Sequence, residues 1–305
     1  MDMCAEKTKM KVRVPASTSN LGSGFDVVGL ALQMYLEVEA VAEGDGLVIE
    51  AEGLGASQLP GDENNLIYRM IREHAGDAAP AGLHLKIRND IPLTRGFGSS
   101  AAAIVAGIAL GLWIKRGTPA ERQVVLAAAS AAEGHPDNAS AAVLGGLTVS
   151  AVIDGQVEAT SLRLPYGIEL VVLIPDREIE TKKAREILPL SIPRSEVVFN
   201  LQRLGLLLAG LFQNNRTYLY HGVKDRIHQG RRIHLLPSMG AVVKALNDHR
   251  GCLGAFISGA GPAVAAFTSG DGQKLGELGI AEFSKEGIPA EARILAPDYL
   301  GLTYD

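Results

Sequence analysis

A chain of 305 residues, 47% of them apolar, is long enough to form two domains of ordinary size. Its net charge of −5 and its aromatic content of 5% argue against a general nucleic-acid-binding protein, which needs a basic face or stacking platforms. No apolar run reaches the ~20 residues that cross a bilayer, and the polar start Met1–Lys11 lacks the apolar stretch of a signal peptide. Two cysteines, Cys4 and Cys252, provide neither a disulfide framework nor metal-ligand spacing. We therefore expect a cytoplasmic protein without nucleic-acid or membrane partners.

The first half of the chain mixes strand-like and helix-like periodicity. In chain order, the predicted elements are a strand over Val12–Pro15, a glycine-rich loop over Ser19–Gly24, strands over Tyr35–Val41 and Leu47–Ala51, a helix over Asn64–His74, a strand over Leu83–Arg88, a turn-rich passage over Asn89–Gly98 and an apolar helix over Ser99–Lys115. Tyr35–Val41 alternates apolar and polar residues, and Leu47–Ala51 is predicted to be its hairpin partner.

The next helix has a clear start signal, with Thr118 as cap, Pro119 at its first position and Glu121 two residues later, and is predicted to end at Glu133. The elements predicted after it are a helix over Asp137–Leu144, strands over Leu147–Ile153 and Ile168–Ile174, helices over Ser195–Phe212 and Met239–Asp248, a hairpin of Cys252–Ile257 and Ala263–Phe267, a helix over Gln273–Glu286 and a strand over Ala290–Leu295. Because strands and helices do not alternate strictly, we expect an α+β fold. The domain boundary is placed in the turn-rich stretch Ile153–Leu164.

The segment Pro92–Ala102, with the sequence PLTRGFGSSAA, is the most informative motif. Its glycines let backbone N–H groups turn toward an anion, and the helix that follows adds its positive end. Ser99 and Ser100 offer hydroxyls to phosphate or Mg²⁺. Read alone, the segment also fits the dinucleotide-binding pattern G-x-G-x-x-A, but a Rossmann site follows the first strand and has an acidic residue ~20 positions on. A glycine-rich loop that merely enters a packed helix is the structural alternative. The chain has no Walker A lysine, which excludes a P-loop enzyme.

Three further clusters carry polar side chains. Glu133–Asn138, with the sequence EGHPDN, follows a helix and gathers two carboxylates, an imidazole and an amide, which suits metal-assisted phosphoryl transfer. Ordinary helix capping and solvation explain the same residues equally well. Asn20 and Asp26 flank a turn that could hold an ammonium or a hydroxyl, although a plain Asx-type turn is the simpler explanation. Thr181 and Arg185 lie one helical turn apart, and arginine matches a carboxylate with two parallel hydrogen bonds.

Taken together, these segments resemble the GHMP small-molecule kinase superfamily and, within it, the homoserine kinase family. The matching segments span nearly the whole chain: Val12–Asp26 with Gly29–Leu32, the phosphate loop Pro92–Ala102, Glu133–Asn138, Thr181–Arg185, His228–Pro237 and Ser258–Pro262. The departures from the family pattern are Ser23 for Pro, Phe97 for Leu, Ala139-Ser140-Ala141 for Val-Ala-Pro and Gly230-Arg231 for Pro-Tyr.

The resemblance implies a two-domain GHMP kinase fold, with an N-terminal nucleotide-binding domain over residues 1–160, a C-terminal ferredoxin-like α/β sandwich domain over 161–305, and an active site in the cleft between them. The residues implied for ATP are Asn65, Pro92, Arg95, Gly96, Phe97, Gly98, Ser99, Ser100 and Ala101. Those implied for Mg²⁺ are Ser100 and Glu133. Those implied for L-homoserine are Arg185 and Arg232 at the carboxylate, with Asn20, Asp26, His135, Asn138 and Thr181 at the ammonium and hydroxyl end. The resemblance is also compatible with a homodimer.

The implied reaction is in-line attack of the homoserine hydroxyl on the γ-phosphate of ATP, giving O-phosphohomoserine and ADP in threonine biosynthesis. Asp26, Asp137 and Asn138 are the candidate catalytic residues, and either carboxylate could take the proton. A loose transition state also lets the hydroxyl lose its proton late, so the base is left open. A GHMP kinase for another small alcohol, a dinucleotide-dependent oxidoreductase and a non-catalytic relative are the alternatives. The paired arginines argue against the first, and the retained Glu133 and Asp26 argue against the last.

Overall fold

The computed structural model describes residues 9–305, so Cys4 and most of the polar start Met1–Lys11 lie outside the described residues. The strands are β1 (Lys9–Asn20), β2 (Gly24–Ala42), β3 (Gly46–Gly53), β4 (Gly82–Asn89), β5 (Leu147–Ile153), β6 (Gln156–Leu162), β7 (Glu169–Pro175), β8 (Cys252–Ile257), β9 (Val264–Thr268), β10 (Ala290–Leu295) and β11 (Thr303–Tyr304). The helices are α1 (Leu66–Ala75), α2 (Ser99–Arg116), α3 (Arg122–Glu133), α4 (Asp137–Leu144), α5 (Thr181–Glu186), α6 (Arg194–Gln213), α7 (Arg216–Gly222), α8 (Gln229–Arg232), α9 (Pro237–Asp248) and α10 (Gly272–Lys285). The mixed helix and strand content confirms the expected α+β class.

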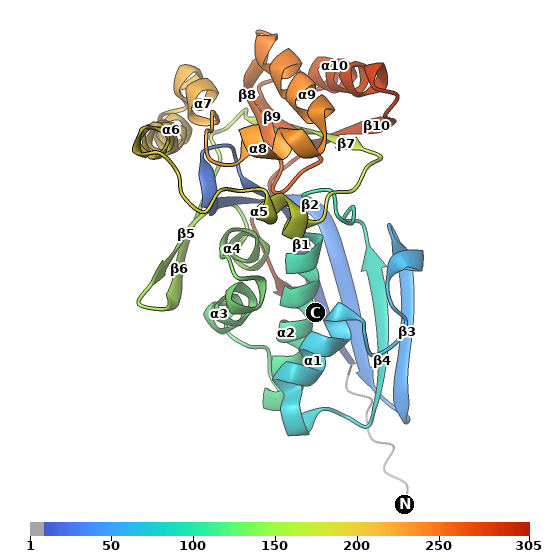
Figure 1. The fold of residues 1–305 in the computed structure, drawn as a ribbon. Coiled ribbons are helices and arrows are strands. Elements are labelled where there is room, and N and C mark those ends of the chain that lie inside the picture. Colours follow the sequence, from blue (N-terminus) through green and yellow to red (C-terminus); the bar gives the residue numbers. More distant parts are fainter. Residues whose placement is uncertain (1–8) are drawn as a thin grey trace, which may run out of the picture.

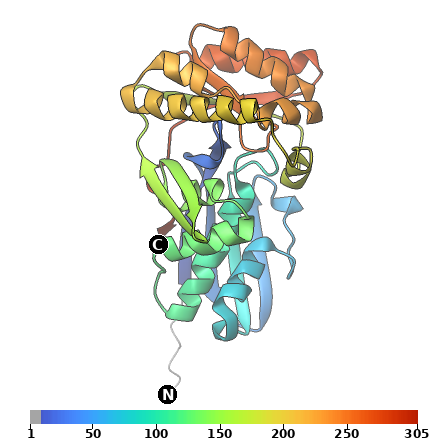
Figure 2. The ribbon, with the colours of Figure 1, turned by 60° about the vertical axis from the view of Figure 1, so that its left-hand side comes forward.

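The first sheet has the strand order β11-β1-β2-β4-β3, and β5 and β6 extend it from β2. Helices α1 to α4 cover one face of this sheet, while the other face is open (Figures 1 and 2). Alternation along the strands separates the two faces, because successive side chains point to opposite sides. Val12 and Val38 are fully buried, whereas Lys11 and Glu37 form an ion pair of 2.8 Å. The buried face and the apolar helix α2 form the main core.

The second sheet is antiparallel, with the strand order β10-β7-β9-β8. Its strands follow the pattern β-α-β-β-α-β along the chain, which confirms the expected ferredoxin-like arrangement. Residues of α9 and α10 form a second core with Val171 and Leu173 of β7. Leu170 and Val172 point to the opposite face and join the main core, so β7 is buried on both sides. Figure 1 shows this sheet and its helices above the first sheet.

Two predictions for individual elements are wrong. β2 and β3 do not form a hairpin: β4 lies between them, antiparallel to β2 and parallel to β3. The chain crosses over through α1, because the apolar side of that helix, including Ile67 and Ile71, must be buried against the rest of the domain. Helix α3 begins at Arg122 rather than at Pro119, since Ala120 is buried and its carbonyl oxygen accepts a hydrogen bond from the Tyr304 hydroxyl at 3.2 Å.

The stretch expected to be turn-rich, Ile153–Leu164, contains the strand β6, which pairs with β5. Successive side chains of β6 point to opposite faces of the hairpin, and the Val157 side chain is buried in the main core. The chain also returns to the first sheet at its end, where β11 pairs with β1. A division at residue 160 remains a prediction, and strands β6 and β11 show that the first sheet uses residues on both sides of it.

Among the described residues, α2 and α6 are long and apolar enough to cross a membrane by length and composition alone. Neither of them contains an unbroken apolar run of ~20 residues. More than half of the α2 window is buried inside the fold, as in the core helix of a soluble protein. Helix α6 lies on the outside of the second domain and packs against α7 (Figure 2).

Candidate active site

A cavity of about 610 Å³ lies where the two sheets' ends approach each other, at the start of α2 and beside α5. Fourteen of the predicted site residues line it: Asn20, Gly96, Phe97, Gly98, Ser99, Ser100, Ala101, Glu133, His135, Asp137, Asn138, Thr181, Arg185 and Arg232. They come from both domains, and Figure 1 places α5 across the top of α2 at this junction. The structure therefore brings together motifs that are distant in sequence.

The phosphate loop enters α2 through glycines with left-handed backbone angles, φ 84° at Gly96 and 63° at Gly98. A side chain at Gly98 would place its Cβ 2.1 Å from the Ser17 hydroxyl. No side chain among the described residues caps the start of α2, so its first N–H groups are open toward the cavity. The Ser258 hydroxyl donates to the Gly96 carbonyl oxygen at 2.6 Å and fixes the loop from the second domain. This loop and helix start are suited to hold phosphate.

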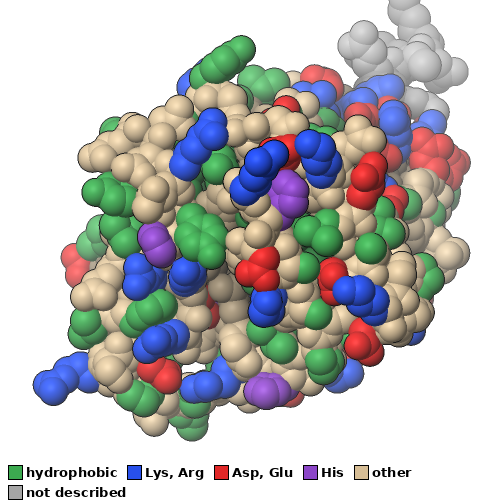
Figure 3. All heavy atoms as spheres, turned by 90° about the horizontal axis from the view of Figure 1, so that it is seen from above, with side chains coloured by type: hydrophobic (Ala, Val, Ile, Leu, Met, Phe, Trp, Pro, Cys, Tyr) green, Lys and Arg blue, Asp and Glu red, His purple; other side chains and the backbone are tan. Residues whose placement is uncertain are grey.

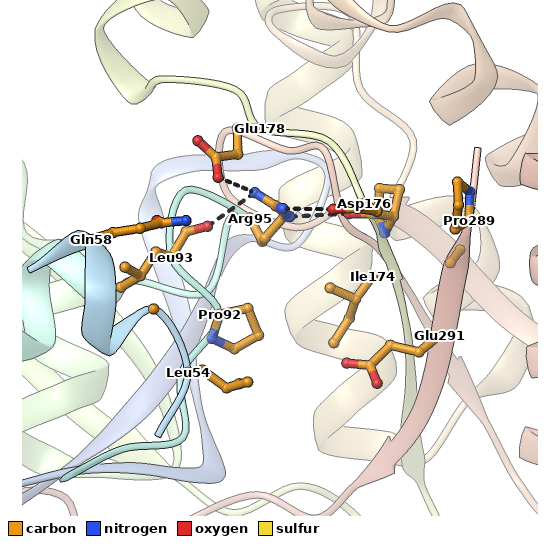
Figure 4. Close-up of a pocket in the computed structure, with 13 residues that line it drawn as sticks. Leu54, Gln58, Pro92, Leu93, Arg95, Ile174, Asp176, Glu178, Pro289 and Glu291 are labelled. Carbon is orange, nitrogen blue, oxygen red and sulfur yellow. Dashed lines mark hydrogen bonds and ion pairs between the residues drawn. The ribbon is translucent and has the colours of Figure 1, made fainter. Parts of the chain in front are cut away.

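Asn65, Pro92 and Arg95 are predicted ATP residues that do not line this cavity. The Asn65 side chain caps α1, accepting from the backbone N–H groups of Ile67 and Tyr68, and is almost fully buried. Pro92 and Arg95 line a separate cavity on the other side of the loop. The Arg95 guanidinium points into that separate cavity, toward Asp176 and Glu178 (Figure 4), so the assignment of Arg95 to ATP remains a prediction.

Glu133, the last residue of α3, is directed into the cleft with its side chain only 9% exposed. Burial raises the pKa of this carboxyl above its usual range, while His135 and a hydrogen bond from Ser100 act against that rise. A buried carboxylate beside a serine hydroxyl and a phosphate loop favours the presence of a positive ion. Glu133 and Ser100 therefore fit a hard divalent cation by ligand type.

The loop between α3 and α4 presents a hydrogen-bonded chain of three side chains. Asp137 is 1% exposed and contacts the His135 ring at 2.5 Å. Burial acts to raise the pKa of Asp137, but the His135 contact, the Asn138 N–H and the Ser19 hydroxyl outweigh it, and the pKa falls below its usual value. Burial acts to lower the pKa of His135, but Asp137 and Glu133 outweigh it and raise that pKa. The two groups therefore form an ion pair within the cleft wall.

Asn138 links this chain to β1. Its side-chain oxygen accepts from the Ser17 hydroxyl at 2.9 Å, and its NH₂ group donates to the Ser19 hydroxyl at 3.1 Å. Ser17 and Ser19 have no role predicted from the sequence, although both lie in the first motif. Two serines before a glycine-rich turn do not indicate a functional site in the sequence. Their contacts with Asn138 become evident only in the folded structure.

Asp26, another predicted site residue, lines a neighbouring cavity rather than this one and is held by Arg185. The two parallel hydrogen bonds measure 2.6 and 3.1 Å, and both side chains are about one-third exposed. Asn20 fixes the turn, since its side chain accepts from the Asp26 N–H at 3.1 Å and donates to the Gly259 carbonyl oxygen at 3.1 Å. The predicted substrate residues Asp26 and Arg185 thus bind each other across the two domains.

Arg232 is a buried cation, 2% exposed, and no carboxylate among the described residues forms an ion pair with it. It donates to the Gly259 and Ala184 carbonyl oxygens at 2.6 and 3.3 Å and to the His228 ring at 3.1 Å. Burial and the nearby Arg185 lower its pKa to about 10, so it stays charged at neutral pH. An arginine buried in this way can accept a carboxylate from the cleft.

Phe25 and His228 lie against the two arginines, and neither has a role predicted from the sequence. Phe25 stacks on the His228 ring with a centroid distance of 5.2 Å, and Arg185 and Arg232 lie 5.6 and 5.5 Å from the Phe25 centroid. His228 is fully buried, and burial lowers its pKa to about 4, so the ring is neutral. It therefore donates to the Gly22 carbonyl oxygen and accepts from Arg232.

Comparison with known proteins identifies the family of this chain. Residues 65–146 match the model of the GHMP kinases N terminal domain, and residues 197–278 match that of the GHMP kinases C terminal domain. The homoserine kinase of Desulfitobacterium hafniense is 35% identical over 296 residues, covering 96% of this chain and 98% of that protein. The chain belongs to the GHMP kinase family.

Two further relatives within this family are also named homoserine kinase. The homoserine kinase of Clavibacter michiganensis is 39% identical over 97% of this chain and 93% of its own length. The crystal structure of homoserine kinase from Cytophaga hutchinsonii matches all of this chain and all of its own with a TM-score of 0.86 at 28% identity. A Lactococcus lactis galactokinase matches with a TM-score of 0.70 at 15% identity, covering 97% of this chain and 95% of that one, and shows a shared fold alone.

Proposed function

We propose that this protein is a homoserine kinase, which transfers the γ-phosphoryl group of ATP to the side-chain hydroxyl of L-homoserine, a step of threonine biosynthesis. The observation that carries the proposal is the buried Arg232, which lacks a carboxylate partner among the described residues and lines the same cleft as the phosphate loop. A small alcohol with a carboxylate fits that combination. The names of the relatives support the same substrate, and we propose the cytoplasm as the location of the enzyme.

The acceptor would be held by groups from both domains. Arg232 and Arg185 would bind its carboxylate, and Asp26, freed from part of its contact with Arg185, would accept from its ammonium group. Asn20, Thr181 and the His135–Asp137–Asn138 chain would orient the hydroxyl end. The positive arginines would thus face the carboxylate of the amino acid, and the negative Asp26 would face its ammonium group.

The phosphate of ATP would lie on the loop and at the start of α2, where backbone N–H groups stabilise negative charge. Mg²⁺ fits Glu133 and Ser100, and when bound it would neutralise charge on the phosphate oxygens. Ligand atoms of Asp26, His135 and Asp137, one from each, also lie within 4.8 Å of one another. Glu133 is the buried carboxylate that Ser100 of the phosphate loop contacts, so we assign the metal to Glu133.

Both carboxylates are already engaged by partners in this geometry. Asp26 is engaged by Arg185, and the pKa of Asp137 is held low by His135 and its other donors, after the opposing effect of burial. A loose transition state needs little help with proton removal, so the main role of these residues is to align the hydroxyl.

The test is ADP release with homoserine, serine, threonine, mevalonate, galactose and 3-aminopropanol, which is homoserine without its carboxylate. We expect the highest kcat/KM for homoserine. Arg232→Ala should raise the KM for homoserine about 10- to 100-fold, the effect of losing a forked contact of roughly 1.5–3 kcal/mol, with a smaller loss in kcat. Arg232→Lys should recover little, because it keeps the charge and loses the fork.

The carboxylate-free analogue is the control. Arg232→Ala should leave the KM for 3-aminopropanol near that of the wild type, as should Arg185→Ala. An equal rise in KM for both compounds would mean that these arginines act in ATP binding or in folding. A preference for mevalonate or galactose would move the protein to another GHMP kinase activity.

A further inference from the structure

The Arg95 side chain leaves the phosphate loop on the side opposite to the cleft. Thr94 and Gly96, its neighbours in the chain, line the active-site cavity, whereas Arg95 lines a second cavity of about 340 Å³ between the domains. Figure 4 shows the guanidinium between Asp176 and Glu178 of the second domain. The Arg95 side chain is only 14% exposed, so the protein has buried most of a charged group within the loop that is expected to hold ATP.

Most of the donor groups of Arg95 are used by the protein itself. Nε donates to the Pro175 carbonyl oxygen at 3.0 Å, and the two terminal nitrogens contact Asp176 at 3.3 Å and Glu178 at 3.1 Å. A further bond of 3.3 Å returns to the Leu93 carbonyl oxygen within the loop. A guanidinium has five N–H groups, so little of this one remains for a nucleotide.

The segment that Arg95 holds leads directly into α5. It runs from the end of β7 at Pro175 to the start of α5 at Thr181, and Asp176, Arg177, Glu178 and Glu180 in it are exposed. Two attachments join it to the phosphate loop: the buried Ile179, whose N–H donates to the Thr94 carbonyl oxygen at 3.2 Å, and the Arg95 contacts. A third, from the Asp176 N–H to the Pro289 carbonyl oxygen at 2.7 Å, holds its first residue to the second domain.

Helix α5 carries Thr181 and Arg185, which line the cleft on the acceptor side. It has only six residues, too few to be stable by itself in water, so its position depends on tertiary contacts. We propose that Arg95 is a positioning residue: it ties α5 to the phosphate loop and so places the acceptor-binding side chains relative to bound ATP. This inference rests on the proposed function for its kinetic consequence, and on the contacts alone for its structural one.

Arg95→Met keeps the aliphatic stem and removes the donors. If α5 is then correctly placed in about one molecule in ten, the KM for homoserine rises about tenfold, because apparent affinity scales with the competent fraction. The KM for ATP should stay within about twofold, since the loop N–H groups and Ser100 are untouched. For Arg95→Lys we expect a KM for homoserine between those of the wild type and Arg95→Met, because lysine keeps the charge but lacks the forked guanidinium.

Arg177→Met is the matched control. Arg177 lies in the same segment and is exposed, and its guanidinium donates to the Asp176 carbonyl oxygen without reaching the phosphate loop. We expect wild-type kinetics from this variant. A raised KM for ATP in Arg95→Met, with an unchanged KM for homoserine, would make Arg95 a nucleotide ligand and overturn the inference.

Hydrogen exchange tests the structural claim without any activity. In Arg95→Met, amides of residues 179–187 should exchange about tenfold faster than in the wild type, while α2 keeps its protection and Arg177→Met shows no change. Equal exchange in all three proteins would overturn the positioning role. If the wild type released no ADP with homoserine, the proposed function would fail, and the exchange comparison would still decide the role of Arg95.

Discussion

The burial of Glu133 favours a bound cation beside its carboxylate. The carboxyl is almost enclosed, and burial raises its pKa, so an ionised Glu133 gains more from a bound cation than an exposed glutamate would. Glu133→Gln keeps the shape and removes the charge. We expect kcat to fall at least ~100-fold, the size of effect seen when one strong transition-state contact is lost.

The steady-state rate at saturating Mg²⁺ measures this, with Glu121→Gln as control. Glu121 lies at the other end of α3, is exposed and does not line the cleft, so its substitution should leave kcat unchanged. Near-normal turnover of Glu133→Gln would remove the metal assignment.

His228 makes folding stability depend on pH. Burial lowers its pKa to about 4, below the unfolded value near 6.5, so under acidic conditions the unfolded state binds a proton that the native state does not. Stability contributed by the neutral ring is therefore present above pH ~6.5 and is lost as the pH falls toward 4. Between pH 7.5 and 5 the loss should be about 2 kcal/mol in the free energy of unfolding.

Urea unfolding of the wild type and of His228→Gln at both pH values checks this. The variant should lose about 2 kcal/mol less than the wild type over the same interval, whatever its stability at neutral pH. Glu133, His135 and Asp137 titrate in both proteins, so their contributions cancel in the difference. Identical pH dependence in the two proteins would contradict the neutral assignment.

At the scale of elements, the loop before α2 depends on a glycine at residue 98. Its φ of 63° is left-handed, and an added Cβ would lie 2.1 Å from the Ser17 hydroxyl and 3.0 Å from the Asn138 side-chain oxygen. Gly98→Val should therefore displace the loop and weaken ATP binding at least ~100-fold, measured by calorimetry on the folded protein.

Gly117→Val separates this clash from simple backbone strain. Gly117 ends α2 with a similar φ of 73°, but no atom of the described residues lies within 4 Å of its added Cβ. This variant should lose stability and keep ATP affinity. Unchanged ATP affinity in Gly98→Val would move the phosphate site elsewhere.

The sequence predicts elements that have strong local patterns, but it does not predict strand pairing or side-chain contacts that depend on tertiary packing. The periodicity of α2 and the glycine-rich start of that helix are local, so both were predicted close to their observed bounds. Whether β3 pairs with β2 or β4 depends on where α1 is buried, which no local pattern records. The motif places Arg95 in the phosphate loop, but no local pattern records that its side chain contacts two acidic residues more than 80 positions away, Asp176 and Glu178.

On the scale of the whole molecule, the end of the chain stabilises its beginning. Tyr304 pairs with Val12 in the first sheet, its hydroxyl donates to the Ala120 carbonyl oxygen, and its ring meets Trp113 edge-on at 5.6 Å. Tyr304→Ala should lower the free energy of unfolding by about 2 kcal/mol, less than a fully buried aromatic loses.

Urea unfolding measures the effect, and Tyr166→Ala is the control because the Tyr166 side chain is fully exposed. Tyr166→Ala should stay within about 0.5 kcal/mol of the wild type. Equal stability of the two variants would show that β11 contributes little to the first domain.

The return of the chain to the first sheet has a consequence for how such a protein can be divided. The chain leaves the first sheet after β6 and comes back just before β11, and the two crossings touch: the Leu164 N–H donates to the Tyr299 hydroxyl at 3.3 Å. Everything between them, including α5 and the two arginines of the cleft, is an insertion whose ends are neighbours in space. An insertion whose ends are adjacent can join a host domain without breaking the path of the host chain. The arginines proposed to bind the acceptor therefore lie on an inserted segment, while the loop proposed to bind ATP belongs to the sheet that receives it.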